Sequence, residues 1–146
     1  MNLDTAIRIG INLAIDGNVL VGGVAVPIFD AYGTPVEQLK YPYILLNVQT
    51  KSQRPGKQRR PMDATIQLDF VTGYKTPFGR SEAEAMEEQA SEIICPDNRN
   101  DLDINLNGWS IDDTFILNSV DFASRNDSFY VFRKTVTFGF ITSKST

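Results

Sequence analysis

The residues best suited to chemistry are five cations crowded into one short segment of an acidic chain. In the stretch QTKSQRPGKQRRPMD (49–63), the first acid is the final residue. Arginine binds carboxylate or phosphate groups through two parallel hydrogen bonds, which suits it to an anionic partner. Nucleic acid, an anionic ligand and an acidic surface of another subunit all fit this chemistry. The cations of this basic segment are Lys51, Arg54, Lys57, Arg59 and Arg60.

The charge of the chain is strongly polarised along the sequence. Residues 40–62 contain six cations and no acid, whereas residues 82–127 contain twelve acids and two cations. The formal net charge is −4, and an independent DNA-binding domain is usually basic overall. The polarity instead favours association between copies in which unlike surfaces meet, and such contacts close into rings when the rotation permits.

The amino-acid composition excludes most of the common catalytic groups. The chain has no histidine and a single cysteine, Cys95, so a Ser–His or Cys–His nucleophile pair and a Cys/His zinc site are excluded. Cys95 follows an apolar stripe, where we expect a small buried residue rather than a nucleophile. Glu87 adjoins Glu88 as a paired carboxylate would, but a solvated or interface role is expected for both. We therefore expect no catalytic residue and no enzyme activity.

Four aspartates could in principle bind a metal ion, but their spacing does not favour a metal site. Carboxylates are the ligands that hard cations prefer, but no EF-hand spacing is present. The sequence accordingly predicts no metal and no cofactor. The aspartates are Asp101, Asp103, Asp112 and Asp113.

Length and hydropathy predict one domain that spans residues 1–146. No apolar run approaches the roughly 20 residues that a membrane helix needs, and the first ten residues do not resemble a signal peptide. We expect no membrane partner. The lone cysteine fits a reducing cytoplasm, because it excludes an internal disulfide.

The first half of the chain is predicted to form one helix followed by three strands. Helical spacing predicts a helix over 3–14, capped by Asn2 and ended by residues 16–18. Pro27 lacks an amide hydrogen, so the run 24–29 is expected to be an edge strand. Apolar density predicts a buried strand over 43–50. Alternation over 63–71 predicts a strand with one packed face and one wet face, the wet face carrying Asp63, Thr65, Gln67 and Asp69.

A second helix follows, with Ser81 as the expected cap and Glu84 completing a capping box. Its predicted buried stripe is Ala83, Met86, Ala90, Ile93 and Ile94. Glutamates at intervals of four, Glu84, Glu88 and Glu92, form an exposed acidic row. Like charges at this spacing repel one another, which marks the acidic row as a candidate for an interface with a basic partner.

Two long strands, over 111–122 and 129–141, complete the predicted fold, and Lys134 interrupts the apolar face of the second. The order of elements predicts an α+β fold, with an antiparallel sheet of four to five strands and two helices packed on one face. Residues 51–62 then join two paired strands. A loop of this length exceeds what a hairpin requires, so we expect it to be either functional or a solvated, mobile loop. Trp109 is expected either to fill the core or to anchor an interface, with the core favoured. Tyr43 is expected to belong to the core.

The order and spacing of these elements resemble the phage tail-completion family, also called tail terminators or head–tail joining proteins. The resemblance rests on VAVPIFDAYGTP, YPYILLNVQT, ATIQLDFVTGY and SEAEAMEEQASEII, and it covers most of the chain. In that family a VPVYD-type strand precedes a PYVVL-type strand, and a helix rich in Glu and Ala follows the next strand. The acidic connection after Pro96 and the arginine-rich loop depart from the family pattern.

The resemblance implies a structural virion protein without catalysis, assembled in the cytoplasm of a host bacterium. It implies a ring of identical subunits, commonly six, that caps the tail tube and docks it to the neck connector. The implied partners are therefore other copies, the tail tube protein, the head connector proteins and DNA passing through the lumen. By position, the basic segment would point into the lumen or toward a neighbour. The alternative from charge alone is a nucleic-acid-binding accessory protein that uses the basic segment.

Overall fold

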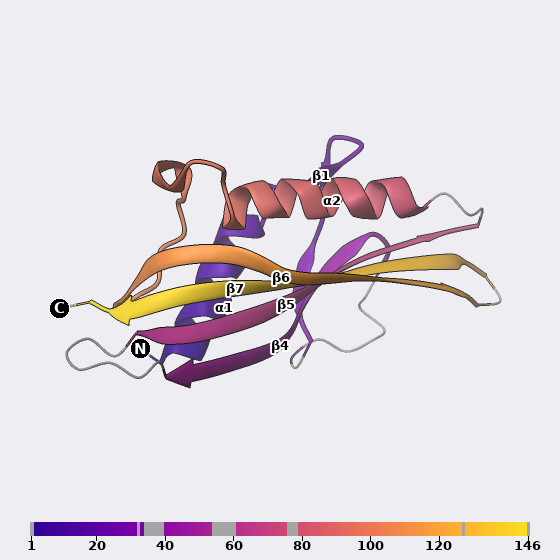
Figure 1. Cartoon of the computed structure of the whole chain (residues 1–146). Coiled ribbons are helices and arrows are strands. Elements are labelled where there is room, and N and C mark those ends of the chain that lie inside the picture. The colour runs from indigo at the N-terminus through magenta and orange to yellow at the C-terminus, as the bar shows by residue number, and fades with distance from the viewer. Residues whose placement is uncertain are drawn as a thin grey trace.

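Two helices lie on one face of a five-stranded sheet, and a small hairpin follows the first helix (Figure 1). The computed structural model describes residues 2–31, 33, 40–53, 61–75, 79–126 and 128–145. The elements in chain order are α1 (Leu3–Ile15), β1 (Leu20–Val21), β2 (Val24–Ala25), β3 (Ile28–Asp30), β4 (Tyr43–Gln53), β5 (Met62–Tyr74), α2 (Gly79–Ile94), a short 3-10 helix (Arg99–Asp101), β6 (Trp109–Arg125) and β7 (Tyr130–Lys144).

The first helix begins and ends where the sequence predicts. The Asn2 side chain accepts a hydrogen bond from the Asp4 amide at 2.8 Å, which satisfies one of the free amides of the first turn. Gly17 follows the helix with φ +77°, a conformation that glycine adopts without a steric penalty. The capping prediction for α1 is confirmed.

The sheet has the strand order β3-β4-β5-β7-β6, so β3 and β6 are its two edges. β4 with β5, β5 with β7, and β7 with β6 pair in antiparallel fashion, whereas β3 pairs with β4 in parallel. The α+β class and the helices on one face are confirmed. The purely antiparallel pairing is corrected at β3, because the long connection from Asp30 to Tyr43 brings the chain back in the same direction.

The run 24–29 is two short strands rather than one. Val24–Ala25 pairs with Leu20–Val21 in a separate hairpin, and Ile28–Asp30 joins the main sheet at its edge. The break falls at Pro27, which has no amide to donate but whose carbonyl accepts from the Ile44 amide at 2.9 Å. The edge position predicted from Pro27 is therefore confirmed, while the single strand is corrected.

The second helix begins earlier than the capping box predicts. α2 starts at Gly79, so Ser81 lies inside the first turn and does not cap the helix. Thr72 of β5 packs against this start: its hydroxyl donates to the Gly79 carbonyl at 2.8 Å, and a Cβ on Gly79 would collide with the Thr72 side chain. Glu84 pairs instead with Arg80 one turn before it, at 3.2 Å.

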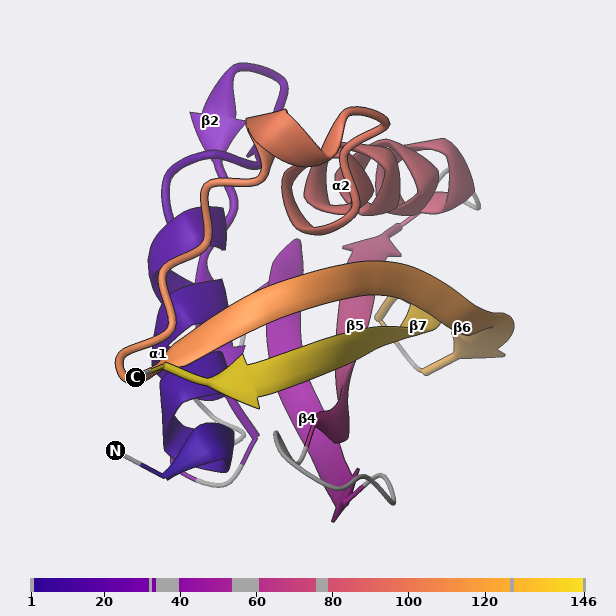
Figure 2. The same cartoon turned by 60° about the vertical axis from the view of Figure 1, so that its left-hand side comes forward.

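The core lies between the helices and the sheet. The side chains of β5 and β7 that face the helices alternate as predicted, and Phe70, Phe138 and Phe140 are almost completely buried. α2 contributes Ala83, Met86, Ala90 and Ile94 as predicted, with Ile93 half-buried. Figure 2 shows α1 and α2 on the same side of the sheet, with the connection between α2 and β6 running down across α1.

The face of the sheet away from the helices, called the outer face below, is only partly wet. Asp63, Thr65 and Gln67 are half-buried, whereas Asp69 is 1 % exposed. Beside Asp69, a second apolar cluster of Tyr43, Leu45 and Val71 covers this face. The prediction of a fully wet face is wrong, because alternation reveals which residues share a face but not what else packs on that face.

The final hairpin is longer than predicted at both strands. β6 and β7 pair from Trp109 with Lys144 to Arg125 with Tyr130, and in Figure 1 the turn end of the hairpin extends beyond the start of α2. The Asn126 side chain accepts hydrogen bonds from the amides of Ser128 and Phe129, at 2.9 and 2.7 Å, which fixes the turn. The register shifts at Asp112 and at Leu117, so β6 carries two bulges.

A substitution at Gly10 tests how closely α1 packs against the connection that follows α2. A Cβ on Gly10 would lie 2.8 Å from Leu106 Cδ2 and 2.9 Å from the Asn105 carbonyl oxygen, both too close. Gly10→Ala gains about 1 kcal/mol of helix propensity, but overpacking costs about 1–3 kcal/mol. We expect a net loss of stability, measured as a lower urea midpoint. The exposed Thr5→Ala in the same helix should change the midpoint little, and a stabilised Gly10→Ala would contradict the packing described.

Candidate functional site

Of the basic segment, only Lys51 falls within the described residues, and it lies in a strand rather than in a loop. β4 continues to Gln53 because Lys51, Ser52 and Gln53 pair with Ala64, Asp63 and Met62 of β5. The Lys51 ammonium lies 3.2 Å from the Asp4 carboxylate at the start of α1. This placement corrects the predicted start of the loop. Arg54, Lys57, Arg59 and Arg60 lie outside the described residues.

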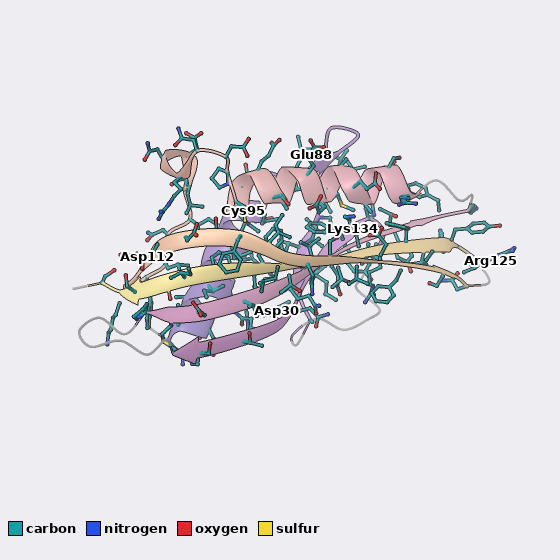
Figure 3. The ribbon with its side chains drawn as sticks, in the orientation of Figure 1. Asp30, Glu88, Cys95, Asp112, Arg125 and Lys134 are labelled. Carbon is teal, nitrogen blue, oxygen red and sulfur yellow. The ribbon has the colours of Figure 1, made fainter. Side chains whose placement is uncertain are left out.

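The acidic row is exposed along its whole length, as predicted. Glu84 is neutralised by Arg80, whose guanidinium also lies 3.8 Å from Asp121 of β6. Glu88 and Glu92 form no ion pair with any described residue. Figure 3 shows Glu88 on the side of α2 that faces away from the sheet. Two of the three glutamates thus carry a surface charge that none of the described residues neutralises.

Glu92 borders a surface hollow of about 570 Å³ between α1, the end of α2 and the connection that follows. Asp101 and Asp103 line the same hollow, and Gly10 and Leu13 of α1 form its opposite side. The charge of the acidic row therefore continues onto the connection. Among the residues that the structure describes, no three side chains of the metal-binding types are grouped to hold an ion.

Lys134, which interrupts the apolar face of β7, is neutralised by its neighbour on β6. Its ammonium donates to the Asp121 carboxylate at 3.1 Å, and the two residues are direct partners in the register. Asp121 also approaches Arg80 of α2, whose guanidinium lies 5.9 Å from the centre of the Phe132 ring. The Lys134–Asp121 pair thus joins β7 to β6, and Arg80 links α2 to the same carboxylate. Partly exposed ion pairs of this kind add little stability.

Cys95 is half-buried directly after α2, which agrees with the expected packing role. Burial raises the pKa of the Cys95 thiol; a hydrogen bond with Thr114 lowers it, and the negative charge of Asp113 raises it. A raised pKa leaves less thiolate at neutral pH, and thiolate is the reactive form. Cys95 is therefore a poor nucleophile in this fold.

The most developed polar network of the described residues centres on Asp69, which the sequence placed on the wet face. Its carboxylate accepts hydrogen bonds from the Thr135 hydroxyl at 2.7 Å and the Asn47 amide at 3.0 Å. The Arg133 guanidinium lies 3.4 Å away and is 40 % exposed, so the pair joins a buried acid to a surface cation. Together with Gln67 and Phe122 these residues line a surface depression of about 460 Å³ on the outer face.

Tyr41 and Tyr43, which precede the basic segment in sequence, are packed together rather than exposed. Tyr43 is 5 % exposed, and its ring centre lies 5.8 Å from that of Tyr41, which also contacts Phe129. Burial raises the pKa of Tyr43, while the positive charge of Arg133 lowers it. The prediction that Tyr43 belongs to the core is confirmed, although it lies in the outer-face cluster. Trp109 is half-buried and packs against the main core, as predicted.

Two apolar surfaces were missed by the sequence reasoning. The β6 apolar row consists of Ile116, Leu117, Val120 and Phe122, each 44–55 % exposed on an edge strand. The α1 ridge consists of Ile9 and Leu13, which are 46 and 71 % exposed. The sequence did carry a signal for the row: apolar residues occupy both odd- and even-numbered positions of one strand, so apolar side chains lie on both of its faces. A strand buried on one face would have shown strict alternation.

No protein-family model matches the sequence, and no curated protein matches it. Among solved structures, a similar chain belongs to the virion of a native gene transfer agent (GTA) particle. The TM-score is 0.70 at 16 % sequence identity, and the match covers 97 % of this chain and 97 % of that one. The likeness shows a shared fold over the whole described structure. Among the described residues, no helix combines the length and hydropathy needed to span a bilayer.

The Asp69 network gives a prediction about stability. Asp69→Ala leaves Arg133, Thr135 and Asn47 without their acceptor, and the loss of buried hydrogen bonds to a charged group should cost about 2–4 kcal/mol. A urea titration measures this loss. Asp97→Ala, at an exposed aspartate of the connection, is the matched control and should shift the midpoint little. Equal effects of the two changes would contradict the structural role of Asp69.

The Cys95 thiol gives a prediction about pH. Because its pKa is raised in the folded protein, reaction with a disulfide reagent should be slower than for a free cysteine at pH 7–8. The reaction rate should also rise with pH, and the midpoint of that rise should lie at a higher pH than it does for a free cysteine. Stopped-flow absorbance over a pH series measures both. The urea-unfolded chain is the control and should react with the ordinary midpoint; an ordinary midpoint in the folded chain would refute the assignment.

Proposed function

We propose that this chain is a structural virion protein of a tailed phage or a related particle. More specifically, it would act as a ring-forming tail terminator that caps the tail tube and docks it to the neck connector. The observation that carries the proposal is the fold shared, over 97 % of both chains, with a chain of a gene transfer agent virion. The sequence resemblance to tail-completion proteins, reached from the order of the elements, points to the same class.

The charge distribution supports assembly of identical copies. Glu88 and Glu92 are exposed without ionic partners among the described residues, and the hollow beside Glu92 adds two aspartates. The sequence places four further cations between β4 and β5. Unlike charges on one molecule attract the neighbouring copy in a fixed direction, and a heterologous contact of this kind generates a closed ring when its rotation closes.

Catalysis has no support in the described geometry. The polar network with the most hydrogen bonds surrounds Asp69, which is saturated by Thr135, Asn47 and Arg133 and therefore holds no free base. The raised pKa of Cys95 keeps its thiol protonated at neutral pH. The function we propose accordingly uses surfaces rather than a reacting centre.

Nucleic-acid binding by the basic segment is the alternative function. Lys51 is held by Asp4. The packed rings of Tyr41 and Tyr43 lie at the other end of β4 from Lys51, so they give the segment no platform for base stacking. If all five cations contact phosphate, filter binding of the isolated protein should show a log–log salt slope of about −4 to −5. Absence of binding removes this alternative and leaves the ring proposal intact.

The direct test of the proposed function is a map of purified particles together with mass spectrometry of their proteins. A ring of this chain between the tail tube and the neck is the expected result. Mass spectrometry that fails to find the chain in particles would refute the proposal, whatever the chain does in isolation.

A charge reversal tests the role of the basic segment in assembly. Arg59→Glu with Arg60→Glu should leave the fold intact, since isolated surface charges contribute about 0–1 kcal/mol, but should abolish incorporation into particles. Circular dichroism and particle yield measure the two effects. Lys75→Glu with Lys144→Glu is the matched control, because both lysines are exposed and lie outside the segment. Loss of the native spectrum in the first variant would instead assign the segment a structural role.

A further inference from the structure

We propose that the open edge of β6 between Asn118 and Arg125, called the β6 window below, binds an extended segment of another protein as an additional strand of the sheet. The segment runs antiparallel to β6 and carries apolar side chains at every second position. The inference rests on the backbone and the register of a single chain, so it goes beyond the proposed virion role and does not depend on it.

The two bulges of β6 define where an added strand can pair. β6 lies at one edge of the sheet and pairs only with β7 among the described strands. The register shifts at Asp112 and at Leu117, and beyond Leu117 the ladder runs without a shift from Asn118 to Arg125. Bulges disrupt the regular spacing of backbone groups, so they confine strand addition to the window. Every residue of the window is exposed, and Figure 3 places Arg125 at the far end of the hairpin.

The backbone groups of the window point alternately toward β7 and toward solvent. The Asn126 amide donates to the Phe129 carbonyl at 3.0 Å, so this pair is of the hydrogen-bonded type. In an antiparallel ladder such pairs alternate with pairs whose N–H and C=O groups point away from the partner strand. These outward groups have no partner among the described residues, and the element whose backbone matches their spacing is a strand. The alternation assigns them to Ser119, Asp121, Ala123 and Arg125.

The opposite edge of the sheet carries the protection that the window lacks. β3 is only three residues long, and the part of β4 beyond it contains a bulge and Lys51. Short strands, bulges and lysines are devices by which proteins prevent unwanted strand addition. The window contains no bulge, proline or lysine, and its one acid, Asp121, is paired with Lys134 at 3.1 Å. Its backbone is therefore free to pair.

The register also sets the side-chain chemistry of the occupant. Val120 and Phe122 lie on the outer face, because they pair with Thr135 and Arg133, and they are 44 and 55 % exposed. Asp121, between them in sequence, lies on the opposite face. Side chains that are directly opposite across two strands contact one another. The added segment therefore needs apolar residues on the outer face and polar residues on the other.

The other open edge of this chain does not meet this requirement. Beyond β3, the β4 strand places Thr50 and Ser52 on the outer face, where they pair with Thr65 and Asp63 of β5. A second copy that offers this edge would leave the apolar side chains of the window without apolar contacts. The observations therefore favour a different protein over the β4 edge of a second copy.

Pairing of two β6 windows about a two-fold axis is also poorly matched. An axis at Asp121 sets this acid opposite itself, and like charges directly opposite one another are destabilising. An axis at Phe122 sets Val120 opposite Ser124, and an axis at Val120 sets Phe122 opposite Asn118. Each arrangement thus either opposes like charges or leaves an apolar side chain opposite a polar one.

A synthetic peptide with the required alternation tests the inference on the full chain. The fluorescently labelled probe acetyl-KTVTVTVK-amide presents valines to one face and threonines to the other, and fluorescence polarisation should show saturable binding. Because antiparallel hydrogen-bonded partners lie on the same face, the amides that donate to the window belong to the threonines. N-methylation of the threonine amides should raise the dissociation constant by roughly tenfold or more. The matched control is N-methylation of the valine amides, which point away from β6 and should leave binding close to that of the unmodified probe.

A proline in the window tests the same contact from the side of the protein. Ala123→Pro removes an outward amide and places the ring on the open side of β6, but it removes no hydrogen bond to β7. The circular dichroism spectrum and the urea midpoint should therefore stay close to those of the wild type, while the dissociation constant for the probe rises roughly tenfold or more. Ala123→Thr keeps the amide and is the control, which should bind as the wild type does.

Hydrogen exchange locates the contact on the wild-type chain. Binding of the probe should slow the exchange of the outward amides of Ser119, Asp121, Ala123 and Arg125, which have no acceptor in the free chain among the described residues. Absence of saturable binding, equal binding of the two N-methylated peptides, or full binding by a folded Ala123→Pro chain would each overturn the proposal. A wild-type dimer in sedimentation velocity that Ala123→Pro dissociates would also overturn it, because the edge would then belong to a second copy.

The outcomes also separate this inference from the proposed function. If the probe binds as described but the chain is absent from virions, the strand-binding edge stands and the virion role falls. If the chain forms a ring in particles and its β6 window pairs with no strand there or in solution, the virion role stands and the inference falls.

Discussion

Burial of one phenylalanine-rich face of the sheet under two helices is the constraint on which the other surfaces depend. Three phenylalanines are almost completely buried beneath α1 and α2: Phe70 of β5 and Phe138 and Phe140 of β7. Burial of large apolar side chains is the main favourable term in folding, at about 1.5–3 kcal/mol for each side chain. Because both helices cover the same face, neither covers the outer face or the β6 edge. The two-layer arrangement thus creates a stable body and, by the same geometry, leaves β6 available.

The Asp69 network shows how the outer face is stabilised without a third layer. The carboxylate is buried between β4 and β7, yet its hydrogen bonds come from Asn47, Thr135 and Arg133 on these neighbouring strands. A buried charge is tolerated when its lone pairs are satisfied, and the cost of removing one partner is then high. Arg133 also acts on Tyr43 of the outer-face cluster, whose pKa its charge lowers against the effect of burial. The polar and apolar parts of this face are therefore coupled.

The periodic elements could be predicted from sequence, and the exceptions have local causes. Alternation over 63–71 identified Ala64, Ile66, Leu68 and Phe70 as core, and helical spacing identified α1 with its Asn2 cap, because both signals are local. The burial of Asp69 depends on residues distant in sequence, which no local pattern records. The contact of Thr72 with Gly79 at the start of α2 and the parallel pairing of β3 likewise join residues that no local pattern relates. The acidic row was predicted as exposed because glutamates at intervals of four require it, whereas the β6 apolar row resembled an ordinary buried strand.

The same features that leave β6 open also limit what can bind there. A long apolar edge strand invites uncontrolled pairing with other chains, and proteins counter this with bulges and charges. Here the bulges at Asp112 and Leu117 break the ladder, and acids at Asp112, Asp113 and Asp121 surround the row. Strand addition by an arbitrary chain is thereby disfavoured, while a partner with apolar side chains and cationic surroundings remains suitable.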